Sequence, residues 1–157
     1  MTITDIKIKD NPEIVSSSIK LMHNDSKRQY ALDMEFDTKK ALKNVKVKVN
    51  IEMRMKFLEN QYFSQTMDIC HFLKNHGTNW QTKFIIGDLN QYPGLPNECP
   101  INSSFYYAKN LTSDLNFIPM KIIPETKFLA TFDVFTYIKK RSVPVSLYKF
   151  EGSLKPQ

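Results

Sequence analysis

The segment from Val45 to Phe57 alternates apolar and polar side chains without a break, and this feature constrains the fold more than any other. Successive side chains of a β-strand point to opposite faces, so a period of two indicates a strand with one buried and one wet face. Burial on one side only is typical of antiparallel sheets. We expect the buried face to carry Val47, Val49, Ile51, Met53 and Met55, and the wet face to carry Lys46, Lys48, Glu52 and Arg54.

Three further segments, 30–36, 128–138 and 143–147, repeat this alternation. Pro144 lies on the opposite parity of the last one, which predicts an edge strand or a β-bulge. Weaker strand candidates are 14–21, 62–72 and 105–108. A chain with about seven strands of this kind is predicted to fold as a mostly β protein, an antiparallel β-sandwich of two sheets.

One segment follows a helical period instead. Thr78 with Gln81 three residues later fits a capping box, and Trp80, Phe84, Ile85 and Leu89 follow at helical spacing. We therefore predict one short helix near residues 79–91. No linker divides the chain, so we expect one domain: a first segment with a strand at 1–27, the sandwich at 28–150 and a tail at 151–157.

The chain of 157 residues has a net charge of +6, which could indicate a nucleic-acid or anionic-membrane partner. The lysines are spread along the sequence, however, and the tightest basic run is Lys139-Lys140-Arg141. We interpret the charge as solvated strand faces and expect no nucleic-acid partner. No apolar run is long enough for a transmembrane segment.

The two cysteines are Cys70 and Cys99. Neither a C-x-x-C nor a paired-histidine motif is present, which disfavours zinc. His71 follows Cys70, but neighbours on a predicted strand point to opposite faces, and this argues against a Cys–His dyad. A disulfide is the favoured interpretation, and a pair of inert buried thiols or a reactive thiol are the alternatives.

The residues from Met67 to Asn75 place an aspartate two positions before a cysteine and follow it with Phe-Leu-Lys-Asn. Together with Cys99-Pro100 and the Tyr-x-x-x-Arg ending at 137–141, this segment resembles the signature of a large insect family of small secreted proteins of unknown function. The resemblance covers residues 28–150. The chain departs from the pattern because it has no cysteine near its N-terminus and no apolar leader.

Members of that family resemble the myeloid-differentiation-related lipid-recognition (ML) domains. The resemblance implies an immunoglobulin-like sandwich that opens between its sheets to hold lipid, and a role in chemosensation for some insect relatives. It also implies secretion, so we expect the N-terminus to be incomplete or trimmed. Three sequons, at Asn24, Asn102 and Asn110, are compatible with an extracellular glycoprotein.

No residue pattern nominates a catalytic centre. The histidines are His23, His71 and His76, and no two of them have metal-ligand spacing. Asp33, Glu35 and Asp37 alternate with apolar residues and predict a wet strand face. We find no phosphate-binding loop or nucleophile elbow, and we expect a protein that is not an enzyme and that needs no cofactor and no metal.

The apolar residues of the predicted inner faces form the candidate ligand pocket. They are Leu32, Met34, Phe36, Val49, Ile51, Met53, Phe84, Phe128, Phe132 and Val134. A packed core is the alternative interpretation of the same residues, although methionine suits variable apolar ligands. Lys46, Lys48, Arg54 and Lys56 are candidates to meet an anionic head group, and a solvated face is the alternative for them.

Two functions stay open at this point. The first is a non-catalytic extracellular binding protein for a hydrophobic or lipid-like small molecule, with a membrane receptor as a further partner. The second is a protein-interaction module with a solid core, which docks through loops or a sheet edge. A void on the order of several hundred Å³ between the sheets would separate them.

Overall fold

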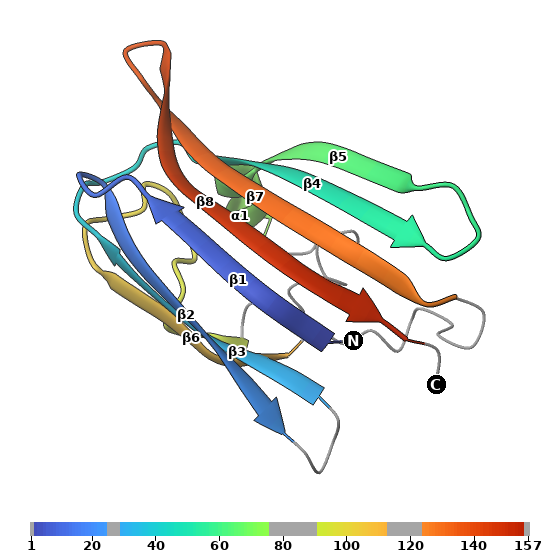
Figure 1. Ribbon diagram of the computed structural model, residues 1–157. Coiled ribbons are helices and arrows are strands. Elements are labelled where there is room, and N and C mark those ends of the chain that lie inside the picture. The colour runs from blue at the N-terminus through green and yellow to red at the C-terminus, as the bar shows by residue number, and fades with distance from the viewer. Residues whose placement is uncertain (1, 25–28, 76–90, 113–123, 156–157) are drawn as a thin grey trace.

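The computed structural model describes residues 2–24, 29–75, 91–112 and 124–155. The elements in chain order are β1 (Thr2–Asp10), β2 (Val15–Asn24), β3 (Gln29–Thr38), β4 (Lys46–Met55), β5 (Gln61–Asp68), α1 (Ile69–Lys74), β6 (Phe105–Thr112), β7 (Thr126–Ile138) and β8 (Arg141–Leu154). One sheet has the strand order β1-β8-β7-β4-β5 and the other β2-β3-β6, and all pairings are antiparallel. Figure 1 shows them as two layers. The predicted mostly β, two-sheet fold is confirmed.

The alternating segment from Val45 to Phe57 forms β4. Val47 and Val49 are 6% and 4% exposed, whereas Lys48 and Arg54 are exposed. Lys46 and Glu52 are half-buried, and so are Ile51, Met53 and Met55. The predicted parity therefore holds along β4, with full burial confined to its first half.

The structure has more strand at both ends of the chain than the sequence predicted. β1 was not predicted, and β8 continues through residues 151–154 of the expected tail. β1 pairs with β8, so the first and last strands lie side by side in one sheet (Figure 1). The Ile6-Lys7-Ile8-Lys9 alternation was a usable signal for β1, but the register shifts between Ile3 and Asp5 and leaves the pattern short.

The expectation at Pro144 is half right. Val134 pairs with Ser146 and the next residue, Phe135, pairs with Pro144, so Val145 bulges out of the β7–β8 ladder. The predicted bulge is therefore confirmed. The alternative of an edge strand is wrong, because β8 lies between β1 and β7.

The predicted strand 62–72 ends earlier than expected, and residues 69–72 are helical instead. The Oδ1 atom of Asp68 accepts a hydrogen bond of 3.1 Å from the backbone N–H of His71, which caps α1. Aspartate is a preferred N-cap because its side chain satisfies an N–H of the first helical turn. The argument that Cys70 and His71 lie on opposite faces of a strand is therefore wrong in its premise. The helix predicted near residues 79–91 lies largely outside the described residues.

The apolar core lies at one end of the sandwich, where the β1–β2 turn and the chain between β3 and β4 meet. Its buried residues are Ile14, Val15, Leu42, Val45, Ile101 and Val145. Both sheets contribute, because Val15 belongs to β2 and Val145 to β8. Leu42 and Ile101 form an isolated β-bridge across the same end.

A polar cluster ties the two sheets together beside this core. The carboxylate of Asp10, at the end of β1, accepts hydrogen bonds from the backbone N–H of Ser17 at 2.7 Å, from its hydroxyl at 2.9 Å and from the hydroxyl of Ser146. The hydroxyl of Ser17 also lies 2.7 Å from that of Tyr148. Since Ser17 gives its proton to Asp10, Tyr148 is the donor of that bond. Ser17 belongs to the smaller sheet and the other three residues to the larger one.

Cys70 of α1 and Cys99 form a disulfide across a sequence separation of 29 residues. The favoured interpretation of the cysteines is thus confirmed, and the alternatives of free thiols are excluded. Cys99 also packs against the apolar core. The bond therefore anchors the chain between α1 and β6 at the same end of the sandwich.

We predict that replacing both cysteines by serine lowers the free energy of unfolding by about 3–4 kcal/mol, because the open chain regains the entropy that the loop closure removes. Denaturant unfolding of the double variant Cys70→Ser/Cys99→Ser and of the parent measures the difference. A matched control is Ser16→Ala/Ser18→Ala, which alters two exposed serines of β2. Equal unfolding midpoints for parent and cysteine variant would contradict the prediction.

We also predict that stability falls as the pH rises above about 10. Burial, with a smaller contribution from the charge of Asp10, raises the pKa of Tyr148, so the folded protein holds the phenolic proton more tightly than the unfolded chain does. This contribution is present below the ordinary tyrosine pKa and is lost as the pH passes through the raised one. In Tyr148→Phe the free energy of unfolding should decrease less steeply with pH, and denaturant unfolding at several pH values above about 10 measures this. Tyr62→Phe, at an exposed position, should leave the fall unchanged; parallel curves for the two variants would refute the assignment.

Candidate functional site

The structure brings most of the candidate pocket residues onto the two inner faces. In the larger sheet Val49 pairs with Phe132, and Met53 pairs with Phe128, so these side chains share one face. That face also carries Ile51 and Val134, because both have the same parity as their neighbours. Leu32, Met34 and Phe36 follow one another on one face of β3, the middle strand of the smaller sheet. The tenth candidate, Phe84, lies outside the described residues.

These inner-face side chains are incompletely buried. Among the nine described candidates, Val49 is buried and the other eight are half-buried. Thr126 and Thr136 are the largest described side chains that are less than 2% exposed, and no described phenylalanine or methionine is buried to that extent. A close-packed core excludes water from its side chains, and these eight side chains keep part of their surface exposed.

Aromatic rings dominate the same interior. The Phe36 ring of β3 meets the Tyr148 ring of β8 edge-on, with 6.3 Å between centroids, and this contact crosses from one sheet to the other. Phe132 and Phe150 meet edge-on at 5.6 Å on neighbouring strands of the larger sheet. Sequence reasoning missed Tyr148 and Phe150, because the predicted alternation of Val143, Val145 and Leu147 has the opposite parity. The bulge at Val145 shifts the register, so Tyr148 and Phe150 face inward and Leu147 pairs with Asp133 on the outer face.

The cations expected to meet a ligand head group lie elsewhere. Lys48 and Arg54 are on the outer face of the larger sheet and exposed. The Nζ atom of Lys46 lies 5.5 Å above the Tyr137 ring, and that of Lys56 lies 5.5 Å above the Phe57 ring. The solvated-face alternative therefore describes Lys48 and Arg54 better than the head-group interpretation does.

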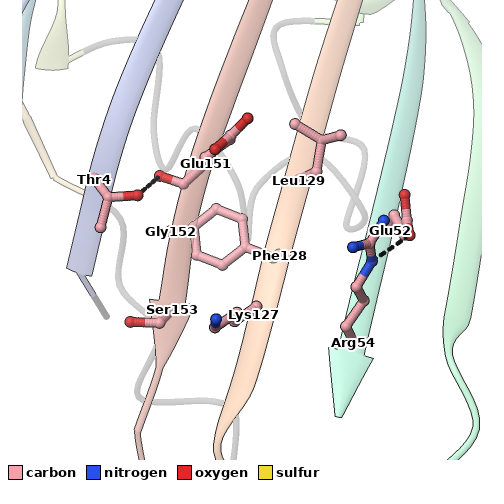
Figure 2. A pocket seen from close by; sticks show the side chains of 9 residues that line it. All are labelled: Thr4, Glu52, Arg54, Lys127, Phe128, Leu129, Glu151, Gly152 and Ser153. Atoms are coloured by element: carbon pink, nitrogen blue, oxygen red, sulfur yellow. Dashed lines mark hydrogen bonds and ion pairs between the residues drawn. The ribbon is translucent and has the colours of Figure 1, made fainter.

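A cavity of about 420 Å³ opens over four strands of the larger sheet. Its lining residues are Thr4, Glu52, Arg54, Lys127, Phe128, Leu129, Glu151, Gly152 and Ser153 (Figure 2). Six of them form two cross-strand rows, Glu52-Leu129-Glu151 and Arg54-Lys127-Ser153. Both rows have the parity of Lys48, so most of the lining belongs to the outer face, whereas Phe128 and Gly152 have the inner parity. Phe128 is the one candidate pocket residue that lines it.

The chemistry of this outer cavity is mixed. Arg54 Nε donates to Glu52 Oε1 at 2.7 Å, and this hydrogen bond and the charge of Glu52 raise the pKa of Arg54 (Figure 2). Leu129 and the Phe128 ring supply apolar surface between the charged groups. The sequence predicted the outward parity of Glu52 and Arg54, but a hollow depends on sheet curvature, which alternation does not encode.

No three His, Cys, Asp or Glu side chains of the described ranges come together as a metal site requires. Every buried side-chain nitrogen or oxygen in those ranges has a hydrogen-bond partner. Within the same ranges no helix is long and apolar enough to cross a membrane.

The predicted sequons stay predictions. Asn102 and Asn110 have exposed side chains. Asn110 has a left-handed backbone with φ 57°, and its N–H donates to Asp33 Oδ1 at 2.8 Å. Asn24 ends β2, and its side chain lies outside the described part of the structure.

A family model described as a protein of unknown function (DUF1091) matches residues 47–130. The chain belongs to this family. The match runs from β4 into β7 and includes the disulfide, so it leaves out β1, β2, β3 and β8. No curated protein matches the chain. The family is uncharacterised, so membership confirms that the chain belongs to a family of unknown function and assigns no activity to it.

The Asp-x-Cys-x-Phe-Leu signature lies inside the matched segment, and its residues have structural roles. Asp68 caps α1, and Cys70 bonds to Cys99. Phe72 and Leu73 are buried, at 8% and 6% exposure. The residues of the signature therefore have a structural role and do not form a reactive centre. They lie where the chain leaves β5, and the disulfide attaches the chain there to the end of the sandwich that holds the apolar core.

We predict that Gly152→Ala destabilises the protein by about 1–3 kcal/mol, because the added methyl overpacks this point of the sheet. A Cβ on Gly152 would lie 2.3 Å from the Thr2 carbonyl oxygen and 2.6 Å from Cζ of Phe128. Thermal or denaturant unfolding measures the loss, and Ser153→Ala on the neighbouring position is the control. An unchanged midpoint for Gly152→Ala would contradict the packing described around Phe128.

Proposed function

We propose that this chain is a non-catalytic extracellular protein that binds a hydrophobic or lipid-like small molecule between its two sheets. The observation that carries the proposal is the state of the inner faces. Eight apolar side chains, from β3 on one sheet and from β4 and β7 on the other, point inward and yet are only half-buried. An apolar ligand lying against them would complete their burial.

The energetics favour an apolar occupant. Each buried methylene contributes about 0.8 kcal/mol, so an acyl-like chain gains affinity from length without needing polar contacts. Met34 and Met53 face this interior with flexible, polarizable side chains, and Phe36 and Phe132 add broad apolar surface. Such a lining tolerates ligands of varied shape, which fits a carrier or a sensor.

The extracellular part of the proposal is supported by the disulfide. Stable disulfides are typical of oxidising compartments and rare in the cytosol. The resemblance to ML-like secreted proteins supports the same location and the same mode of binding, including a role in chemosensation. Family membership is compatible with this proposal and adds no activity of its own.

We predict that Met53→Ala changes the affinity for a fluorescent fatty-acid probe several-fold while costing less than the about 2–5 kcal/mol expected for the same change in a packed core. The matched control is Met22→Ala, because Met22 is 49% exposed on the outer face of β2. Probe titration and denaturant unfolding of both variants give the two readouts. Native mass spectrometry of the parent, purified from a secreting host, looks for a co-purifying lipid.

The opposite outcome has an equally clear signature. A full core-sized loss of stability in Met53→Ala, no bound mass and no probe binding would contradict the proposal. Those results would favour the alternative, an interaction module with a solid core.

A further inference from the structure

Two exposed aromatic rings are neighbours on the outer face of the smaller sheet. Phe105 is 54% exposed and Tyr107 is 41% exposed, and both belong to β6. They pair with Asp37 and Glu35 of β3, whose side chains point away from the larger sheet. The ring centroids are 6.2 Å apart and the ring planes differ by 28°. The rings belong neither to the apolar core nor to the candidate pocket, so their exposure needs another explanation.

The Tyr107 ring is held in place by the turn that precedes β6. The backbone N–H of Tyr107 donates to the Gly94 carbonyl oxygen at 3.0 Å. A Cβ on Gly94 would lie 2.7 Å from Cε2 and from Cζ of the ring, so glycine is needed for this close approach. The ring therefore packs against Gly94 while the residue stays partly exposed. A ring positioned in advance can bind a flat surface without losing further rotamer entropy.

The predicted sequon Asn110-Leu111-Thr112 lies on the same face as this ring. Leu111 pairs with the inward-facing Leu32 of β3, so Asn110 before it faces outward. The register shifts by one residue just before this point, and the bulge places Asn110 in the sheet where a residue two positions after Tyr107 would stand. Same-face neighbours of a strand are about 7 Å apart, which is close enough for the first sugars of an N-linked chain to reach the ring.

The backbone at Asn110 is fixed by its surroundings. Its φ of 57° lies in the left-handed region, which asparagine adopts more readily than most residues. The Asp33 carboxylate accepts its N–H at 2.8 Å. The sequon at Asn102 differs, because it precedes β6 and residues 99–101 in front of it include no aromatic side chain. Of these two sequons, Asn110 is the one that follows an outward-facing ring in a strand.

We propose that Asn110 carries an N-linked glycan and that its first sugars lie on the Tyr107 and Phe105 rings. The C–H groups of a sugar ring carry partial positive charge, so they are attracted to the negative face of an aromatic ring. Hydroxyl groups of the same sugars lie near Glu35 and Asp37, whose carboxylates accept hydrogen bonds. The glycan thereby covers apolar surface that the described part of the chain leaves in water.

The position of the acceptor favours a glycan of this chain over a sugar or a protein from elsewhere. The acceptor, the bulge and the rings lie in one strand, so an attached sugar is present at a high effective concentration. β6 is an edge strand, and a bulky polar group beside exposed aromatic rings hinders pairing with other chains. The proposal rests on the extracellular location proposed above and is independent of the proposed ligand.

The full chain, secreted by a eukaryotic host, tests the proposal. Peptide mass spectrometry should find a glycan at Asn110. Thr112→Val removes this sequon and keeps Asn110 in its left-handed conformation. It should lower the unfolding midpoint of the secreted protein by about 2–4 °C, the shift that one contact of ordinary strength gives in a chain of this length. Ser104→Ala removes the Asn102 sequon as the matched control and should leave the midpoint unchanged.

Two further measurements assign the effect to the ring. The same variants from a bacterial host, which adds no such glycan, give the effect of each substitution alone. In a double-mutant cycle, Thr112→Val should have a much smaller effect when Tyr107→Ser is also present. Proton NMR of the secreted parent covers the case in which Tyr107→Ser misfolds. The acetyl methyl protons of the first N-acetylglucosamine on Asn110 should be shifted upfield by the ring current of Tyr107.

Several results would overturn the proposal. They are an unoccupied Asn110, equal effects of Thr112→Val and Ser104→Ala, no coupling in the cycle, and acetyl protons at the positions of a free glycan. An unoccupied Asn110 together with binding of an added N-acetylglucosamine oligomer would assign the rings to a foreign glycan instead, which also contradicts it. None of these results concerns binding of the fatty-acid probe, so failure here and failure of the proposed ligand are distinguishable.

Discussion

The carboxylate of Asp10 is the interaction on which the arrangement of the two sheets depends. It stands where β1 ends, and it accepts hydrogen bonds from Ser17 of the smaller sheet and Ser146 of the larger one. Removing the acceptor would leave the half-buried backbone N–H of Ser17 unpaired, and leaving a donor unpaired costs more than its hydrogen bond contributes. The apolar core and the disulfide lie at the same end. Along β4, burial is fullest at this end and decreases toward the far half of the strand.

Because the apolar core, the Asp10 hydrogen bonds and the disulfide all lie at one end of the sandwich, the fold can be stable while its inner faces stay incompletely buried elsewhere. The core residues and the Asp10 cluster hold the sheets together, so Ile51 and Met53 need not pack tightly to maintain the fold. Exposed apolar area that stability does not require is the kind of surface that binding sites use. The two regions also differ chemically. The hydrogen-bonded Asp10 cluster is polar, whereas the rest of the inner faces is rich in methionine and phenylalanine.

Much of the fold could be predicted because alternating apolar and polar residues show directly which face of a strand is buried. Val47, Lys48 and Val49 fix the orientation of β4, and a slip by one residue would reverse every side chain. β1 escaped prediction because the bulge at Thr4 breaks its short alternation. Residues 69–72 were assigned to a strand because their apolar character fits either period, and the capping by Asp68 decides for a helix. The outer cavity was beyond sequence reasoning, since it depends on how far the sheet curves between Glu52 and Glu151.

The position of β8 has a consequence for how the molecule is made. β8 lies between β1 and β7, so β1 finds its ladder partner only after residues 146–153 have been made. Contacts so distant in sequence slow folding, because a long loop must close before any of them forms. Until β8 is made, β1 and one edge of β7 lack their strand partner, and Asp10 lacks the hydrogen bond from Ser146. The larger sheet is therefore completed only once β8 has been made, and until then its unpaired edges expose the chain to aggregation.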